Sequence, residues 1–440
     1  MGDVLERVKF HRGVGVPLLW QSAVFNAMFY VDSFVLGFVG PREVAAVSAG
    51  AQVAWLYEAF IACAAYVGGT LVGRLAGAGR EPETRAVVHH GYVATAVLAA
   101  AIGIPSFVLA NQIAGLMIAD AATADLMASY LRWSIAAYTL STFGMVVETA
   151  LQNLKEQRFV LHVYAAEFTL KLVVTLVLVF GFGLGLAGVV ASLLAAKALR
   201  LVLLLHGART RLPRLRASGR PADYGWSVFA TQAAPLALSV LIWNVSTLVI
   251  SSGFGQLPIE QYAAYSVLNN AMYLLLIPTE AYTKTVAILV ARLLGSPLGR
   301  DQRALSDRLR DVTLAGVVLA LATAVASAVY ALLLPLVQPS LGGAVQDTLL
   351  DLAVPFACLV FTKSVTDSLT EGVLRPTFKN RFLLWVEVAA LPVTVVIFHI
   401  GDIDVVSGFW YLVLLEGLRM ALVFGRQRHW LRNEVVQEAT

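Results

Sequence analysis

The sequence predicts an all-α polytopic membrane protein with twelve transmembrane helices in two six-helix lobes. The first observation is composition: 58% of the 440 residues are hydrophobic and only 14% are charged, against roughly 25% charged residues in soluble domains. The second is that apolar segments of about 20 residues recur, which is the length an α-helix needs to cross the hydrocarbon. The third is an internal repeat that relates the two halves.

Twelve apolar segments are predicted to cross the membrane, with boundaries set to within several residues. They are residues 13–39, 46–73, 86–110, 126–151, 159–181, 186–206, 226–252, 261–291, 311–335, 347–374, 382–400 and 406–425. The N-terminal "MGDVLERVKFHRG" lacks the Ala-x-Ala-like site of a cleaved signal, so we expect the first segment to remain in the protein.

Positive charge is concentrated in alternate connections between these segments. Most of the 32 lysines and arginines lie at the N-terminus, in the even-numbered loops or after the last segment, whereas Arg42 alone lies in the odd-numbered loops. By the positive-inside rule, both termini are predicted to be cytoplasmic, in a bacterial-type plasma (inner) membrane. The net charge of +4 therefore reflects topology, and no nucleic-acid partner is expected.

The sequence offers few groups for cofactor or metal chemistry. Cys63 and Cys358 both lie within predicted spans, far apart in sequence, which indicates packing residues rather than a disulfide or a metal site. No nucleophile motif, phosphate-binding loop or histidine cluster stands out. We therefore expect neither an enzyme nor a bound cofactor.

An internal duplication defines the predicted domains. Moving the second half back by about 218 residues superposes Pro235 on Pro17, "AAYS" on "AAVS" and "VARL" on "VGRL". The polar stretch 207–225 reads as a basic cytoplasmic linker between an N-terminal lobe, residues 1–206, and a C-terminal lobe with its tail, residues 226–440.

The number of helices in the repeat sets its symmetry. Six spans separate equivalent positions, so both lobes have the same orientation, and their pseudo-two-fold axis is predicted to lie along the membrane normal. That is the plan of parallel-repeat transporters, which give alternating access to a cavity between lobes. The alternative is a duplicated bundle that serves as a scaffold.

Several stretches carry a family resemblance. "VDSFVLGFVGPREVAAVS", "VGGTLVGRLAGAGREPETR", "ALQNLKEQRF" and "VFGFGLGLAG" in the first 190 residues, and more loosely "ARLLGSPLGRDQRA" and "GVLRPTFKNRF" in the second half, resemble the multidrug and toxic compound extrusion (MATE) transporters. The resemblance implies a two-lobed secondary exporter that moves an organic solute out in exchange for an inward proton or sodium ion.

The resemblance also suggests a coupling residue. Asp32 matches the family's coupling carboxylate in the first helix, and an ionised carboxylate within a membrane span is a functional residue by default. In the fifth span, Phe168, Lys171 and Thr175 stand where the family places amides that help bind the cation. In the seventh, Trp243 stands at an acidic position of some relatives. These departures favour a proton over sodium as the coupling ion.

Charged residues within the fifth span complete the predicted cation-coupling set. Glu167 and Lys171 are four residues apart on one helix, so they are expected to pair. Lys171 lies roughly 20 Å along the helix from the cytoplasmic end, too deep for easy snorkelling. If Lys171 approaches Asp32, its ammonium takes the electrostatic place of sodium. The alternative is a helix-helix salt bridge that only fixes packing.

Pairs of opposite charge recur in the second lobe and suggest a solute route. Such a lining suits a zwitterionic or multiply polar solute, unless each pair satisfies itself internally. We predict Pro278 as a kink beside this route. Lys197, Arg200, Glu416 and Arg419 are expected to snorkel or pair at the membrane interface. The predicted solute-binding residues are Glu58, Asn244, Tyr273, Glu280, Lys284, Lys363 and Asp367.

The preferred function is export of a polar or amphiphilic organic solute, such as a drug or natural product, by a monomer in the lipid bilayer. Two alternatives remain. A flippase for a lipid-linked saccharide needs a strongly cationic cavity, whereas the set here has both signs. A membrane-embedded transferase needs a carboxylate, histidine or metal constellation at one membrane face, and the sequence shows none.

Overall fold

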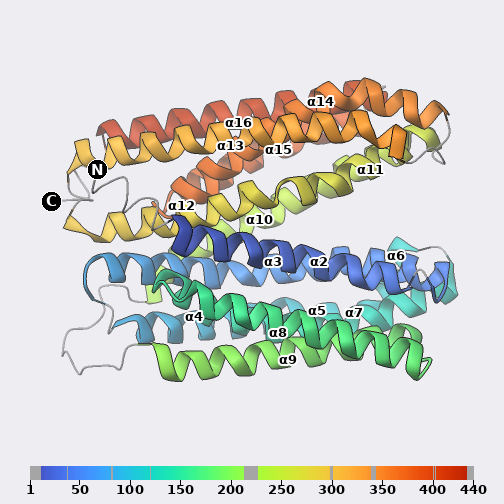
Figure 1. The fold of residues 1–440 in the computed structure, drawn as a ribbon, viewed down its shortest axis with the longest axis horizontal. Helices are drawn as coiled ribbons and strands as arrows, with labels where there is room; N and C mark the ends of the chain where they lie inside the picture. Colours follow the sequence, from blue (N-terminus) through green and yellow to red (C-terminus); the bar gives the residue numbers. More distant parts are fainter. Residues whose placement is uncertain are drawn as a thin grey trace. The chain divides into compact units, whose positions relative to one another are not determined.

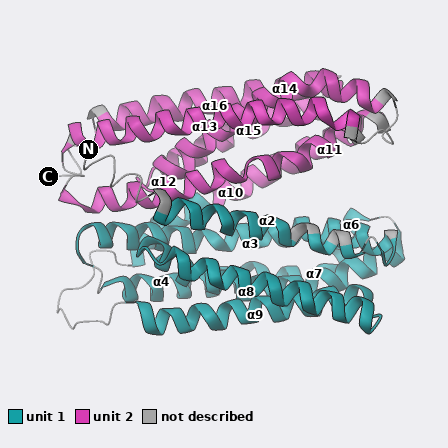
Figure 2. Cartoon of the chain, viewed as in Figure 1, with its two compact units in different colours: residues 1–237 teal, residues 238–440 magenta. Residues whose placement is uncertain are grey.

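The computed structural model describes residues 11–36, 38–80, 83–118, 120–212, 226–297, 301–337, 343–399, 401 and 403–433, in which every regular element is a helix (Figure 1). The chain forms two compact units, residues 1–237 and residues 238–440 (Figure 2). The boundary falls inside one helix, α10 (Trp226–Phe254). Of the predicted linker, residues 213–225 lie outside the described residues, so the predicted domain boundaries stay a prediction.

Unit 1 contains the first six predicted spans. Its helices are η1 (His11–Gly15), α2 (Val16–Leu36), α3 (Pro41–Gly77), α4 (Thr84–Leu98), η3 (Ala99–Gly103), α5 (Ile104–Val108), α6 (Ala110–Met117), α7 (Ala121–Asn153), α8 (Gln157–Leu176), η4 (Val177–Gly181) and α9 (Gly185–Arg211). The elements labelled η are π-helical turns, which within helices often mark functional sites.

Unit 2 follows the same plan from α10 onward. Its further helices are α11 (Ile259–Leu275), α12 (Ile277–Gly295), α13 (Gln302–Val337), α14 (Gly343–Asp367), η7 (Ser368–Leu374), α15 (Asn380–His399) and α16 (Val405–Asn433). Several helices continue beyond the predicted spans, because the polar residues at their ends still form the backbone hydrogen bonds of the helix. The sixth, α9, runs to Arg211 instead of residue 206.

The predicted fold class is confirmed. Within the described residues, ten helices are long and apolar enough to cross a membrane, and the bent pair α11–α12 brings the number to as many as eleven. Helix α2, 21 residues long, lies within the predicted first span, residues 13–39. The bend between α11 and α12 is 43° and falls next to Pro278, which confirms that predicted kink.

The two units pack their helices in equivalent ways, as a duplication requires. In unit 1, α7 packs against α3 and α9, and α9 packs against α8. In unit 2, the helices at the same places in the repeat make the same contacts, since α14 packs against α11 and α16, and α16 packs against α15. The fourth and sixth spans of each unit are therefore its central helices.

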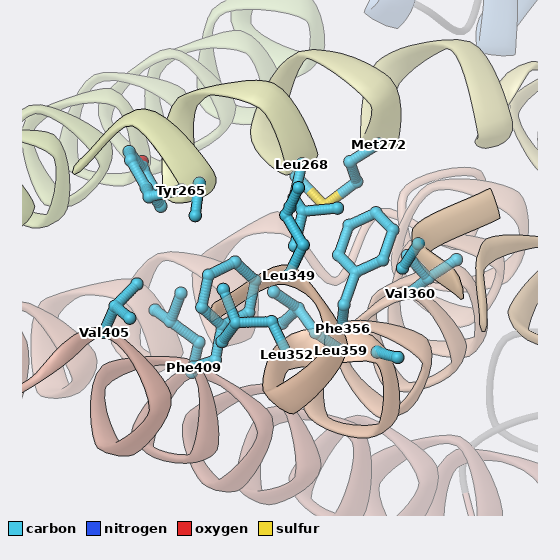
Figure 3. Packing of buried hydrophobic residues seen from close by; sticks show 14 of the residues in the cluster. Tyr265, Leu268, Met272, Leu349, Leu352, Phe356, Leu359, Val360, Val405 and Phe409 are labelled. Atoms are coloured by element: carbon cyan, nitrogen blue, oxygen red, sulfur yellow. The ribbon is translucent and has the colours of Figure 1, made fainter. Parts of the chain in front are cut away.

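Unit 2 has a large aromatic and aliphatic core between α11, α14 and α16. Phe356 of α14 and Phe409 of α16 are almost completely buried in one cluster with Tyr265 of α11 (Figure 3). The ring centroid of Phe409 lies 6.1 Å from that of Tyr265 and 6.3 Å from that of Phe356. The rings of Phe254 and Tyr265 stack with their centroids 4.1 Å apart. Lipid tails are as apolar as this core, so the side chains gain little by leaving the lipid. Close packing between the side chains, rather than the exclusion of water, therefore holds these helices together.

Candidate ion-coupling and solute-binding residues

Asp32 of α2 and Lys171 of α8 form a buried ion pair. The Nζ atom of Lys171 lies 2.8 Å from Oδ2 of Asp32 and donates a second hydrogen bond, 3.0 Å long, to the carbonyl oxygen of Met28. Only 7% of Asp32 and 3% of Lys171 is exposed. The structure thus contains the contact between Lys171 and Asp32 that is needed if the lysine ammonium takes the electrostatic place of a sodium ion.

Thr175, another position of the fifth span that departs from the family's amides, also contacts a neighbouring helix. Its hydroxyl lies 2.6 Å from that of Ser192 on α9. Oδ1 of Asp32 is buried without a hydrogen-bond partner among the described residues. The Asp32 carboxyl therefore has one oxygen bonded to Lys171 and one buried oxygen without a hydrogen bond in the described part of the chain.

The expected pairing of Glu167 with Lys171 is wrong. Glu167 is fully buried, but Nζ of Lys197 lies 2.8 Å from its Oε1, and Nε of Arg200 lies 3.7 Å from its Oε2. Both cations come from α9, which packs along α8. Helical spacing alone allowed the Glu167–Lys171 pair, but packing turns Glu167 toward α9 and Lys171 toward α2.

Lys197 and Arg200 are buried among the helices of unit 1 and form ion pairs, as the prediction that they snorkel or pair allows. Arg200 is 1% exposed, pairs with Glu148 of α7, and donates 3.0 Å hydrogen bonds to the hydroxyls of Ser141 and Tyr164. Since α9 continues to Arg211, Arg200 lies about 16 Å from the helix end. The predicted position of both residues at the membrane interface stays a prediction.

Glu58 of α3 is buried against α7. The hydroxyl of Ser141 donates to its Oε1 over 2.6 Å. This hydrogen bond joins two neighbouring helices of unit 1. The proposed solute-binding role of Glu58 stays a prediction.

The second-lobe pairs form as the sequence predicts. Lys363 and Asp367 on α14 lie 3.1 Å apart, and Glu280 and Lys284 on α12 lie 2.7 Å apart. The Lys363 ammonium also lies 5.3 Å from the ring centroid of Trp243, a cation–π contact that the sequence did not indicate. These side chains keep some exposure, 39% for each member of the α12 pair and 41% for Asp367.

The remaining predicted residues of unit 2 differ in setting. Asn244 is buried and its amide donates to the Val240 carbonyl within α10, whereas Tyr273 is partly exposed. Arg419 of α16 is buried and pairs with Glu416 at 2.7 Å and with Glu387 of α15 at 2.6 Å. The pairing agrees with the sequence prediction for Glu416 and Arg419, whereas their position at the membrane interface stays a prediction. Within the described ranges, no group of histidine, cysteine and carboxylate side chains is arranged to hold a metal.

The residues that the sequence singled out thus fall into two sets. Unit 1 holds buried carboxylates and cations, which include Asp32 paired with Lys171, and Glu167 and Glu58. Unit 2 holds two partly exposed ion pairs, and the ring of Trp243 lies beside the Lys363 ammonium of one of them. A partly exposed pair beside an aromatic ring can contact a polar organic molecule.

Comparisons with known proteins agree with this architecture. The sequence model of the family MatE matches residues 17–177. A curated protein of Shewanella oneidensis named FAD transporter is 23% identical over 287 residues, an alignment that covers 62% of this chain and 62% of that protein. This chain therefore matches somewhat less than two thirds of that relative's length.

Solved structures share the fold along nearly the whole chain. The eukaryotic MATE transporter AtDTX14 superposes with a TM-score of 0.85 at 15% identity, with 99% of each chain covered. A transporter of the MOP superfamily from Pyrococcus furiosus superposes with a TM-score of 0.78 at 15% identity, over 97% of this chain and 96% of that one. All of these similar proteins are named as transporters, in agreement with the class that the sequence predicts.

Proposed function

Since this chain belongs to the MATE family of membrane transporters, we propose that it exports a polar or amphiphilic organic solute by antiport against protons. The family and its multi-pass helical fold make it a membrane transporter rather than an enzyme. The coupling ion, the solute, the inner-membrane location, the cytoplasmic termini and the monomeric state are parts of the proposal.

The observation that carries the proposal is the buried pair of Asp32 and Lys171. A carboxylate in a membrane span is costly unless it is paired or protonated, and Lys171 supplies the pairing charge. When Asp32 takes up a proton, the attraction to Lys171 falls, and the α2–α8 contact weakens. Proton binding therefore favours one arrangement of α2 and proton release the other, which is the two-state element that antiport requires.

The same pair supports a proton over a sodium ion. A sodium ion at Asp32 needs several oxygen ligands, but Oδ2 of Asp32 faces an ammonium, and Thr175 is bonded to Ser192. Bringing Na⁺ to this site places two cations on one carboxylate. A proton on Asp32 needs no ligand set and competes with Lys171 only through charge.

The solute route is proposed to use the unit 2 set. Lys363, Asp367 and the ring of Trp243 offer a cation, an anion and a stacking surface within a few ångströms, a combination that suits a planar molecule with polar groups. Because a similar protein is named FAD transporter, flavin adenine dinucleotide is one solute to test. Its pyrophosphate, like that of a lipid-linked saccharide, requires more positive charge than these balanced pairs offer, so the panel also contains zwitterionic and cationic solutes.

A lipid-linked saccharide flippase is less well supported. Its pyrophosphate requires an excess of positive charge, but the buried ionisable residues of unit 1 include more acids than bases. The exposed pairs of unit 2 are balanced.

Reconstituted vesicles test the proposal. The vesicles are loaded with flavin adenine dinucleotide or with one of a panel of zwitterionic and cationic solutes. Efflux of the solute is then followed under a pH gradient without sodium, and under a sodium gradient without a pH difference. We expect solute movement with the pH gradient in the wild type and none in Asp32→Asn. Strict dependence on sodium refutes proton coupling.

A further inference from the structure

The buried ionisable side chains of unit 1 do not balance in charge. Among the described residues of this unit, four acids and three bases are buried: Asp32, Glu58, Glu148, Glu167, Lys171, Lys197 and Arg200. If all were ionised, a net negative charge would remain inside the helix bundle. Proteins generally neutralise such a surplus, because a buried unpaired charge is more costly than a bound proton.

Two of the four carboxylates face cations directly. Asp32 is paired with Lys171, and Glu167 lies against both Lys197 and Arg200. Each of these contacts favours the ionised form of the acid. Neither residue is therefore the one that holds the extra proton while its partners stay in place.

Glu148 is also well supplied with donors. It pairs with Arg200, accepts a hydrogen bond from the Tyr164 hydroxyl at 3.1 Å, and accepts another from the Gln152 amide at 3.0 Å. Three donors, one of them a cation, favour a carboxylate at this position.

Glu58 is the remaining carboxyl, and its setting differs from the others. Its hydrogen-bond donor is the hydroxyl of Ser141, and no lysine, arginine or histidine of the described residues lies within ion-pair distance of it. It lies near the middle of α3, about 26 Å from Pro41 and about 28 Å from Gly77 along the helix axis. We propose that Glu58 is a second proton-binding carboxyl, neutral in this conformation and separate from the Asp32–Lys171 pair.

The side-chain hydrogen bonds around this part of α3 join it to α7. Ser141 donates to Glu58, and the neighbouring Tyr57 hydroxyl bonds the hydroxyl of Thr139 over 2.5 Å. The buried Tyr138 ring lies 5.8 Å from the Lys197 ammonium, which pairs with Glu167. None of these offers Glu58 a paired cation in the described part of the chain.

The nearest route from Glu58 to a cation passes through Ser141. The Ser141 hydroxyl donates to Glu58 and accepts a 3.0 Å hydrogen bond from Nη1 of Arg200. Loss of the Glu58 proton would place a third carboxylate near Arg200, in addition to Glu148 and Glu167. The protonation state of Glu58 is thereby linked to the contact between α7, α8 and α9, and the transporter has two carboxyls, not one, whose proton content can change.

Infrared spectroscopy of the purified protein in lipid nanodiscs tests this proposal without solute or gradient, so its outcome is independent of coupling at Asp32. At neutral pH we expect a carbonyl band of a protonated carboxylic acid in the wild type. The band should be lost in Glu58→Gln and retained in Asp404→Asn, which changes an exposed carboxyl outside the buried set. A wild type and a Glu58→Gln variant with the same carboxylic-acid band overturn the proposal, as does loss of the band in Asp404→Asn alone.

A second variant keeps the test decisive if Glu58→Gln does not fold. Ser141→Ala removes the hydroxyl that donates to Glu58, so the carboxylic-acid band should shift to higher frequency, as it does when a hydrogen bond is removed. An unchanged band in Ser141→Ala shows that the proton is held elsewhere.

Discussion

Arg200 in unit 1 and Arg419 in unit 2 hold equivalent places in the duplicated chain. Each is buried in the sixth helix of its unit and pairs with a glutamate of the fifth helix, Glu167 or Glu387. Lys197, three residues before Arg200, corresponds to Glu416 before Arg419, so the charge is reversed at this one place. The repeat thus preserves an arginine–glutamate contact between the same two helices.

This contact predicts different costs for two arginines of α9. Arg200→Met leaves the buried Glu148 and Glu167 without a shared cation and should lower the free energy of unfolding by about 3–5 kcal/mol. Arg211→Met is the matched control, because Arg211 pairs with Glu156 where both side chains are partly exposed, and it should cost less than about 1 kcal/mol. Denaturant unfolding in detergent measures both. Equal effects would mean that the buried contact adds nothing.

The Asp32–Lys171 pair predicts a non-additive double substitution. Lys171→Met leaves a buried carboxylate without its cation and should destabilise the protein by about 3–5 kcal/mol. In Asp32→Asn with Lys171→Met, no unpaired charge remains, so much of this loss should be regained. Thermal unfolding of the two single variants and the double variant gives the coupling. Additive effects would show that the two side chains act independently.

Close packing of α3 on α7 depends on Gly69. A Cβ atom at this position would lie 2.8 Å from Cβ of Thr149, whose hydroxyl donates to the Ala65 carbonyl. Gly69→Ala should therefore cost about 1–3 kcal/mol through overpacking. A Cβ atom at Gly115 would meet no other atom within 4 Å, so Gly115→Ala should be neutral or stabilise by up to about 1 kcal/mol. The reverse order of unfolding midpoints would contradict the packing.

Asp404, just before α16, predicts a pH-dependent contribution outside the membrane spans. The Ser407 hydroxyl and backbone N–H both donate to its carboxylate, and these bonds lower the pKa of Asp404. A lowered pKa gives stability that is present above the ordinary value of about 4 and is lost as pH falls through the lowered one. Because Asp404 is exposed, Asp404→Ala should cost only about 0.5 kcal/mol at neutral pH.

The control for this effect is Asp404→Asn, which retains an acceptor but does not titrate. Unfolding midpoints are measured for the wild type and both variants from neutral to acid pH. The midpoints of the wild type and Asp404→Ala should converge as the pH falls, because the wild type then loses the contribution of its carboxylate. A difference between them that grows toward acid pH would contradict this origin.

The sequence predicted the fold well because its signals are local and strong. Span length, charge asymmetry and the repeat of "VGRL" by "VARL" each require only the chain itself, and Pro278 marked the observed bend correctly. Asp32 drew attention because a carboxylate in an apolar helix is rare. The i, i+4 pairs of unit 2 also formed as expected, since both partners lie on one helix.

The partners between helices were harder to predict. Whether Glu167 meets Lys171 on its own helix or Lys197 and Arg200 on the next depends on how α8 and α9 rotate against each other. Helical spacing holds no information about that rotation. The packing of α9 against α7 and α8 also buries Arg200, and the sequence does not reveal that packing.

Solute-dependent proton flux is the sharpest test of coupling at Asp32. The protein is reconstituted in weakly buffered vesicles that contain a pH-sensitive dye. Flavin adenine dinucleotide, or another solute shown to bind, is then added on one side of the membrane. If Asp32 couples transport, the wild type moves protons when solute is added, and Asp32→Asn binds solute with unchanged affinity but moves none. The same proton flux in Asp32→Asn as in the wild type would contradict coupling through this carboxyl.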